Sequence, residues 1–285
     1  MRHWGPQLVH ESYYASHGAG PDNVPVVITV LDMIHEIHGD SFSGFDNTTE
    51  LKRAAVDRAD HIICISENTR RDLVSLWGIA EEKTSVVYLG MDDFRPAASV
   101  KPYATSAGKP YLLYVANRNT YKNFSGLLRA YSMSERLMND FNIVAFGGGP
   151  FSRSERDSID QFGICQNSVL QLSGDDALLA SVYSGASAFI YPSYYEGFGL
   201  SPLEAMGQGC PVISSNTSCL PEVLDSAAEY FDPASAETLC SALENTLYDP
   251  ARLEELRSLG FERIKRFTWE ACARSTMSVY KAVLD

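Results

Sequence analysis

Short, continuous apolar runs alternate with longer helical segments along most of this chain of 285 residues. Residues 24–31 read VPVVITVL, 61–65 read HIICI, 111–116 read YLLYVA and 141–146 read FNIVAF. Strands that are apolar at every position are buried on both faces, which is typical of a parallel sheet covered by helices. The alternation of such strands with helices therefore predicts an α/β fold with parallel sheets.

A polar segment with three prolines, residues 92–110, interrupts this pattern and is typical of a linker. It divides the chain into a first α/β domain over residues 1–95, a linker over 96–109 and a second α/β domain over 110–267. A final helix is expected over 268–285.

The remaining elements follow from the same patterns. Strands are expected at 8–10, 24–31, 61–65, 84–89, 111–116, 141–146, 169–172, 187–192 and 211–214. Helices are expected at 51–60, 66–77, 124–137, 175–186, 234–248, 250–267 and 269–284.

Residues 191–204, which read YPSYYEGFGLSPLE, predict a strand end, a glycine turn and the start of a helix. Ser201 is the expected N-cap, Pro202 suits the first helical position, and Glu204 stands three residues after the cap. The unpaired N–H groups and the dipole of a helix N-terminus favour an anionic ligand. The stretch therefore predicts an anion site.

Two carboxylates, Glu196 and Glu204, flank this expected anion site. Carboxylates do not bind phosphate, so we expect them to face hydroxyl groups, such as those of a sugar and a ribose. Simpler alternatives stay open from the residues alone. Glu204 can be only the capping-box partner of Ser201, Glu196 a solvated loop acid, and Gly197 and Gly199 part of a tight turn.

The spacing of the two glutamates in residues 191–204 resembles the pattern of a known protein family. Seven residues separate Glu196 from Glu204, and GFGL follows the first of them directly. This resembles the E-x7-E signature of the retaining glycosyltransferases of family 4, which have the GT-B fold. The likeness extends from about Val9 to the C-terminus. It implies an α/β, GT-B type structure of two Rossmann-like domains with parallel sheets, the N-terminal domain being incomplete.

The resemblance also assigns roles to residues around the stretch. It implies that Glu204 binds the ribose hydroxyls of a nucleotide-sugar donor and that Glu196 binds hydroxyls of the transferred sugar. The donor diphosphate would be held by the cations Arg118 and Lys122 and by the backbone N–H groups of Gly197, Phe198, Gly199 and Leu200.

Arg118 and Lys122 lie in NRNTYKN, directly after the strand expected at 111–116. Ligands bind at the carboxyl ends of parallel strands, and an Arg fork with a Lys point charge suits a diphosphate. From the residues alone, a solvated basic loop is an equal alternative. The similarity of YVANRNTYKNF to a phosphate-binding pattern of family 4 favours the diphosphate.

The first domain is expected to be incomplete, because residues 26–36, VVITVLDMIHE, are similar to the middle of a family 4 N-terminal domain. A misassigned start, a truncated gene or a second polypeptide that completes the domain would each account for this. Many relatives carry His directly before the Asp of this segment, whereas here Leu31 precedes Asp32. His35 can substitute for it or simply pack in the loop.

The resemblance further implies that the last helix crosses back onto the first domain. This predicts an apolar face on that helix, made by Trp269, Cys272, Met277, Tyr280 and Val283.

The net charge of −13 argues against a nucleic-acid partner, which needs a basic face. No apolar run reaches about 18 residues and no signal-peptide pattern occurs, so a cytoplasmic protein is expected, with peripheral contact at the inner membrane face left open. The H-x-x-H pair at His35 and His38 lacks a third ligand, and no D-x-D loop is evident. No metal site and no cofactor are therefore expected.

Together these features predict a metal-independent, retaining hexosyltransferase. It would move a hexose, with mannose as the favoured sugar, from a GDP- or UDP-linked donor to a glycan or lipid-linked acceptor. Two alternatives stay open: a truncated, non-catalytic nucleotide-sugar-binding subunit that needs a partner chain, and a sugar-nucleotide epimerase.

Overall fold

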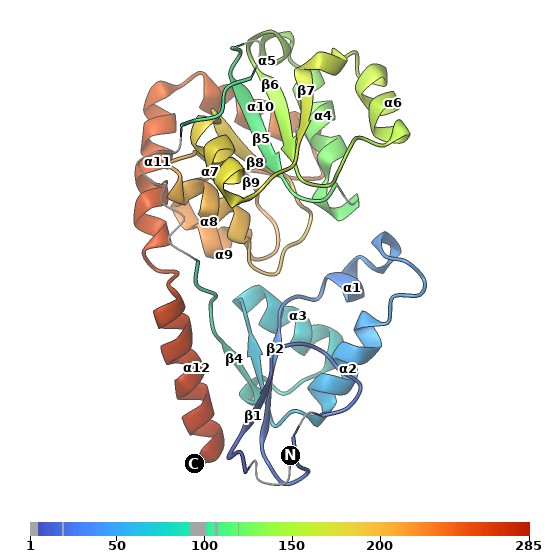
Figure 1. The fold of residues 1–285 in the computed structure, drawn as a ribbon, viewed down its shortest axis with the longest axis vertical. Coiled ribbons are helices and arrows are strands. Elements are labelled where there is room, and N and C mark those ends of the chain that lie inside the picture. The colour runs from blue at the N-terminus through green and yellow to red at the C-terminus, as the bar shows by residue number, and fades with distance from the viewer. Residues whose placement is uncertain (1–4, 19, 92–100, 106–107, 119) are drawn as a thin grey trace. The chain divides into compact units, whose positions relative to one another are not determined.

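The computed structural model describes residues 5–18, 20–91, 101–105, 108–118 and 120–285 (Figure 1). The linker predicted at 96–109 therefore lies in part outside the described residues. No helix among the described residues is both long and apolar enough to cross a lipid bilayer.

The chain forms two compact units. Unit 1 comprises Met1–Gly90, Glu196–Phe198 and Phe267–Asp285, and unit 2 comprises Met91–Tyr195 and Gly199–Arg266. A short piece of the 191–204 stretch thus belongs to the first unit, although both its neighbours in sequence belong to the second.

Unit 1 is built on four parallel strands in the order β1-β2-β3-β4. The strands are β1 Val9–Glu11, β2 Val26–Val30, β3 His61–Cys64 and β4 Thr84–Val86. The helices are α1 Ile34–Ile37, α2 Thr48–Arg58, α3 Glu67–Trp77 and α12 Trp269–Leu284.

Both faces of this sheet are covered, as the apolar strands predicted. Ile28 and Ile62 pack with residues of α2 and α3, while Val27 and Ile63 point to the opposite face and pack with Val279 of α12. Successive residues of a strand point to opposite faces, so each strand contributes apolar side chains to both layers.

The last helix, α12, packs on the sheet of unit 1 (Figure 1). Cys272, Tyr280 and Val283 contribute to the contact as expected, and the Tyr280 ring meets the ring of His10 edge-on at 5.5 Å. The predicted face was wrong for two residues, Trp269 and Met277, whose exposed fractions are 49% and 51%. The buried Val279, one turn from Val283, takes their place.

Unit 2 has six parallel strands in the order β10-β9-β8-β5-β6-β7. The strands are β5 Tyr111–Val115, β6 Asn142–Phe146, β7 Val169–Leu172, β8 Ala188–Tyr191, β9 Val212–Ser215 and β10 Ala228–Phe231. The helices are α4 Phe124–Ser132, α5 Glu135–Asp140, α6 Arg153–Gln161, α7 Asp176–Gly185, α8 Leu200–Gly207, α9 Leu220–Leu224, α10 Ala236–Leu247 and α11 Pro250–Ile264. Counted along the chain, this is the 3-2-1-4-5-6 order of a doubly wound sheet.

The structure corrects three expectations in unit 2. The helix predicted over 124–137 is two helices, because Ser134 accepts a hydrogen bond from the N–H of Leu137 and caps α5. The sixth strand, β10, was missed, as was α6, whose start is fixed by a capping box between Ser152 and Glu155.

A fully buried lysine lies at the carboxyl end of β2. Lys52 of α2 has no exposed surface, and its Nζ lies 2.7 Å from Oε2 of Glu36 and 3.7 Å from Oδ1 of Asp32. It also donates to the carbonyl oxygen of Asp32 at 2.9 Å and lies over the ring of Tyr14. A buried charge is tolerated when it is paired and hydrogen-bonded in this way.

We expect Lys52→Met to lower the free energy of unfolding by about 3–5 kcal/mol, because it leaves a buried carboxylate without its partner. Adding Glu36→Leu, which makes the pair apolar, restores most of the loss. Urea titration measures both changes. Arg53→Met is the matched control: its ion pair with Asp57 on the same helix is half-exposed, so about 0.5 kcal/mol is expected. Equal effects of Lys52→Met and Arg53→Met would contradict the prediction.

Candidate active site

The order of strands in unit 2 indicates at which end of its sheet a ligand is expected to bind. β5 and β8 are neighbours, and the chain leaves them toward opposite edges. In doubly wound sheets this reversal opens a crevice at the carboxyl ends of the two strands, where ligands bind. The predicted residues follow these two strands: Arg118 and Lys122 follow β5, while the glycine turn and Glu204 follow β8.

The helix that follows β8 begins two residues earlier than predicted. Gly199 is the N-cap of α8, with a left-handed φ of 95° that glycine adopts without strain, and no side chain caps the helix. The expected N-cap, Ser201, is instead the second helical residue, so the capping-box interpretation of Glu204 was wrong. Among the described residues, no side chain makes an N-cap hydrogen bond to α8, which is the position where an anion would bind.

Glu204 lies in the second turn of α8 and is half-buried. Its Oε2 accepts a hydrogen bond from the hydroxyl of Tyr183, at 3.2 Å. Tyr183 belongs to α7 and is completely buried. The sequence offered no signal for this partner, because an aromatic residue near the end of a helix more often simply fills the core.

Glu196, Gly197 and Phe198 belong to unit 1. Glu196 is buried, with an exposed fraction of 6%, which excludes the solvated-acid interpretation. A Cβ atom on Gly197 would lie 2.1 Å from the carbonyl oxygen of Leu31, so the close contact requires glycine. The ring of Phe198 packs edge-on against that of Phe267, with centroids 5.5 Å apart.

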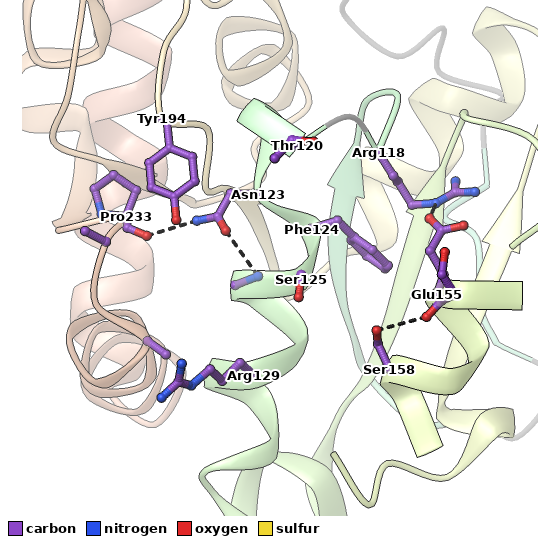
Figure 2. Close-up of a pocket in the computed structure, with 14 residues that line it drawn as sticks. Arg118, Thr120, Asn123, Phe124, Ser125, Arg129, Glu155, Ser158, Tyr194 and Pro233 are labelled. Atoms are coloured by element: carbon purple, nitrogen blue, oxygen red, sulfur yellow. Dashed lines mark hydrogen bonds and ion pairs between the residues drawn. The ribbon is translucent and has the colours of Figure 1, made fainter. Parts of the chain in front are cut away.

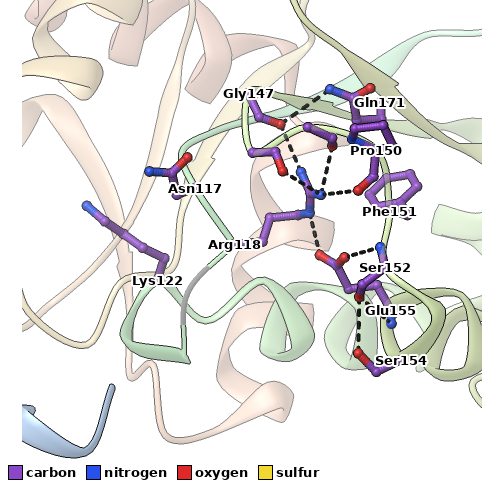
Figure 3. Close-up of polar contacts among 12 residues, drawn as sticks. Asn117, Arg118, Lys122, Gly147, Pro150, Phe151, Ser152, Ser154, Glu155 and Gln171 are labelled. Atoms are coloured by element: carbon purple, nitrogen blue, oxygen red, sulfur yellow. Dashed lines mark hydrogen bonds and ion pairs between the residues drawn. The ribbon is translucent and has the colours of Figure 1, made fainter. Parts of the chain in front are cut away.

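Arg118 is held almost entirely by the protein (Figure 3). Its Nε donates to Glu155, Nη1 donates to the carbonyl of Gly147 at 2.8 Å, and Nη2 contacts the carbonyls of the next three residues. Its side chain is 5% exposed, so it is not a solvated loop cation. The guanidinium also lies over the ring of Phe151. In this structure Arg118 fixes the turn after β6, and its predicted contact with a phosphate stays a prediction.

The carboxyl of Glu155 responds to this arrangement. Burial opposes its ionisation, yet the hydrogen bonds from Arg118 and Ser152 and the charge of Arg118 lower its pKa below the usual value. A carboxylate with a lowered pKa stays ionised at neutral pH, so the pair contributes stability there and loses it as the solution becomes acidic.

Lys122 is placed differently from Arg118. It ends the short 3₁₀ turn Thr120–Lys122, and its Nζ lies 5.1 Å from the ring centre of Tyr121 and 5.8 Å from that of Tyr191. In Figure 3 its side chain extends away from the Arg118 contacts. The two predicted cations therefore do not form one cluster, and Lys122 is the one beside the end of β8.

Asn123 ties the loops at this end of the sheet together and was missed in the sequence. It is the N-cap of α4, where its Oδ1 accepts from the N–H of Gly126 at 3.2 Å. Its Nδ2 donates to the carbonyl of Pro233, after β10 (Figure 2), and to the carbonyl of Pro192, after β8. An Asn directly before a predicted helix is a recognisable N-cap signal, but its contacts with the two distant loops are not visible in the sequence.

Two of the cavities lined by the described residues open at this end of unit 2. One, of about 490 Å³, lies beside the first turns of α4 and is lined by residues that include Arg118, Asn123, Arg129 and Tyr194 (Figure 2). The other, of about 350 Å³, is lined by Asn117, Arg118 and the turn that follows β6. The second lies at the carboxyl ends of β5 and β6, where this type of sheet binds ligands.

Models of two protein families match the chain. One, described as glycosyl transferases group 1, matches residues 98–263. The other, described as glycosyltransferase family 4, matches residues 1–95. Together they cover almost the whole sequence.

Curated proteins similar to the chain include two from Escherichia coli. The O-antigen chain mannosyltransferase B is 30% identical over 240 residues, which are 80% of this chain and 62% of that protein. The serotype-specific mannosyltransferase WbdA is 27% identical over 294 residues, which are 96% of this chain and 36% of that protein. The chain thus spans less than two thirds of the length of these relatives.

Solved structures with a similar fold include a sucrose-phosphate synthase from Thermosynechococcus elongatus. It is 23% identical with a TM-score of 0.76, and the likeness covers 99% of this chain and 75% of that one. Anabaena HepE, solved in complex with UDP and glucose, is 17% identical with a TM-score of 0.73 over 90% of this chain and 72% of that one. These likenesses confirm the predicted GT-B fold class.

We expect Arg118→Lys to lower the free energy of unfolding by about 2 kcal/mol, because one ammonium group cannot reach the acceptors that the guanidinium fork serves. Urea titration measures the change. Arg153→Lys is the control, since Arg153 lies on the helix of Glu155 and its ion pair with Asp157 is exposed, so about 0.5 kcal/mol or less is expected. A loss for Arg118→Lys no larger than the control's would show that Arg118 is not a structural residue.

Proposed function

The chain belongs to the family of glycosyl transferases group 1, and we propose that it transfers a hexose from a nucleotide-diphosphate sugar to a glycan or lipid-linked acceptor. One observation carries the proposal: the uncapped N-terminus of α8 and the side chains of Lys122 and Glu204 follow the two strands at which the strand order reverses. That end of the sheet is where doubly wound folds bind nucleotides.

The diphosphate, the ribose and the transferred hexose of the donor each have a partner in this proposal. The diphosphate lies at the N-terminus of α8, where backbone N–H groups and the helix dipole favour negative charge, and Lys122 adds a cation. Glu204 accepts hydrogen bonds from the ribose hydroxyls, and Glu196 accepts them from the transferred hexose. Arg118 fixes the turn after β6, and its contact with the diphosphate stays a prediction.

The proposed reaction retains the configuration of the anomeric carbon. The acceptor hydroxyl attacks from the face that the diphosphate leaves, the glycosidic bond to the diphosphate breaks, and the departing phosphate oxygen takes the hydroxyl proton. The helix N-terminus and Lys122 stabilise the negative charge that develops on the leaving group. These groups belong to the protein, so the proposal needs no metal ion.

Mannose from GDP-mannose is the proposed donor sugar. The support is the similarity to the two mannosyltransferases of Escherichia coli. UDP-linked donors are the alternative, and the first of the following experiments distinguishes the two bases.

We expect the purified chain to bind GDP more tightly than UDP in isothermal titration calorimetry, and Glu204→Ala to weaken that binding about tenfold or more, since a hydrogen bond to a charged group is lost. Glu262→Ala is the control, because this acid is exposed and pairs with Lys265 at the surface end of α11. Unchanged GDP and UDP affinities in Glu204→Ala would overturn the assignment of Glu204.

A second variant tests the diphosphate. Lys122→Ala is expected to weaken GDP about tenfold and to leave the affinity for guanosine, which carries no phosphate, unchanged. Equal losses for GDP and guanosine would place Lys122 away from the phosphates.

Transfer itself is tested with GDP-mannose and a mannose-terminated oligosaccharide, with the product examined by NMR. The expected product carries an α-linked mannose, the configuration of the donor. A β-linked product would overturn the retaining mechanism, and transfer from UDP-glucose but not from GDP-mannose would overturn the donor.

A further inference from the structure

Tyr183 and Glu204 come together from the two helices that flank β8. Tyr183 lies near the end of α7, five residues before the strand begins, and Glu204 lies on α8, after the strand ends. The ring of Tyr183 packs edge-on against that of Phe189 in β8, with centroids 5.5 Å apart. The hydroxyl reaches Oε2 of Glu204 at 3.2 Å.

The direction of this hydrogen bond is set by chemistry. An ionised carboxylate has only acceptors, so the phenol must donate its single proton to Glu204. The side chain of Ser201, one helical turn before Glu204, acts to lower the pKa of the same phenol. Burial, followed by the negative charge of Glu204, raises the pKa of Tyr183 well above its usual value, so the phenol keeps its proton at neutral pH.

The hydroxyl has no packing purpose at this position. Phe would fill the same apolar volume, and burying a hydroxyl costs free energy unless it is hydrogen-bonded. The hydroxyl adds a hydrogen bond to a half-buried carboxylate. Because the ring is held rigidly by the core, this hydrogen bond restricts the movement of one oxygen of Glu204.

We infer that Tyr183 is a positioning residue, which orients the carboxylate of Glu204 to accept hydrogen bonds from the ribose of a ribonucleoside diphosphate. The inference rests on the proposed function, in which Glu204 binds the ribose. It makes Tyr183, although it touches no ligand, a determinant of the preference for ribose over deoxyribose.

The test is Tyr183→Phe, which keeps the ring and removes the hydroxyl. Calorimetry measures the affinities for GDP and 2′-deoxy-GDP, and for UDP and 2′-deoxy-UDP. The wild-type chain is expected to prefer the ribonucleotide about tenfold. In Tyr183→Phe this preference falls to about threefold or less, because a mobile carboxylate binds the ribose less well.

Tyr131→Phe is the matched control. Tyr131 is also completely buried in unit 2, and its hydroxyl donates to the carbonyl of Phe141 at 2.7 Å, within the core below α4. We expect both variants to lose similar thermal stability, and only Tyr183→Phe to lose the ribose preference. A merely structural hydroxyl would change the melting temperature and leave that preference untouched.

Two outcomes separate this inference from the proposed function. A ribose preference that disappears in Glu204→Ala but persists in Tyr183→Phe would overturn the role of Tyr183 and leave the proposed function standing. A preference that persists in Glu204→Ala, or is absent from the wild-type chain, would overturn the placement of the ribose at Glu204 and the role of Tyr183 with it.

Discussion

The reversal of strand order between β5 and β8 is the constraint on which the candidate site depends. Two parallel strands whose connections leave in opposite directions leave a crevice between the following loops. The loops that line such a crevice must be held by contacts between them. Here Asn123, which follows β5, donates to the carbonyl of Pro192, which follows β8. The backbone N–H of Tyr194 in turn donates to the carbonyl of Tyr121 at 2.8 Å.

The two cations after β5 show why charge alone does not define a phosphate site. Arg118 is occupied by one carboxylate and four backbone carbonyls, and a phosphate would have to replace contacts that also fix the turn. Lys122 contacts two aromatic rings and carries its charge on a flexible stem. A compact ammonium group can shift toward an anion with little rearrangement, whereas a buried guanidinium fork cannot.

Much of the fold could be predicted from the sequence, because apolar runs and helical periodicity report local structure and burial. The start of α8 could not, since the Ser-Pro pair at 201–202 suits an N-cap as well as the second and third helical positions. The left-handed conformation of Gly199 decided between them. The face of α12 was half right, because a periodic pattern identifies a stripe but not its exact centre: Val279 is buried, whereas Met277 is exposed. Partners distant in sequence, such as Tyr183 for Glu204, leave no local pattern.

The two units share one physical solution to the problem of holding an acid at the end of a strand. In unit 1 the buried Lys52 binds Glu36 and the backbone of Asp32, directly after β2. In unit 2 the buried Tyr183 binds Glu204, after β8. Apolar packing alone cannot fix the orientation of a half-buried carboxylate such as Glu204. A hydrogen-bond donor that is buried in the core can fix this orientation, because the free-energy cost of burying the donor is offset by the hydrogen bond that it makes. The two anchors differ in charge. Lys52 is a cation beside a carboxylate that is itself buried, whereas Tyr183 is a neutral donor to the half-buried Glu204.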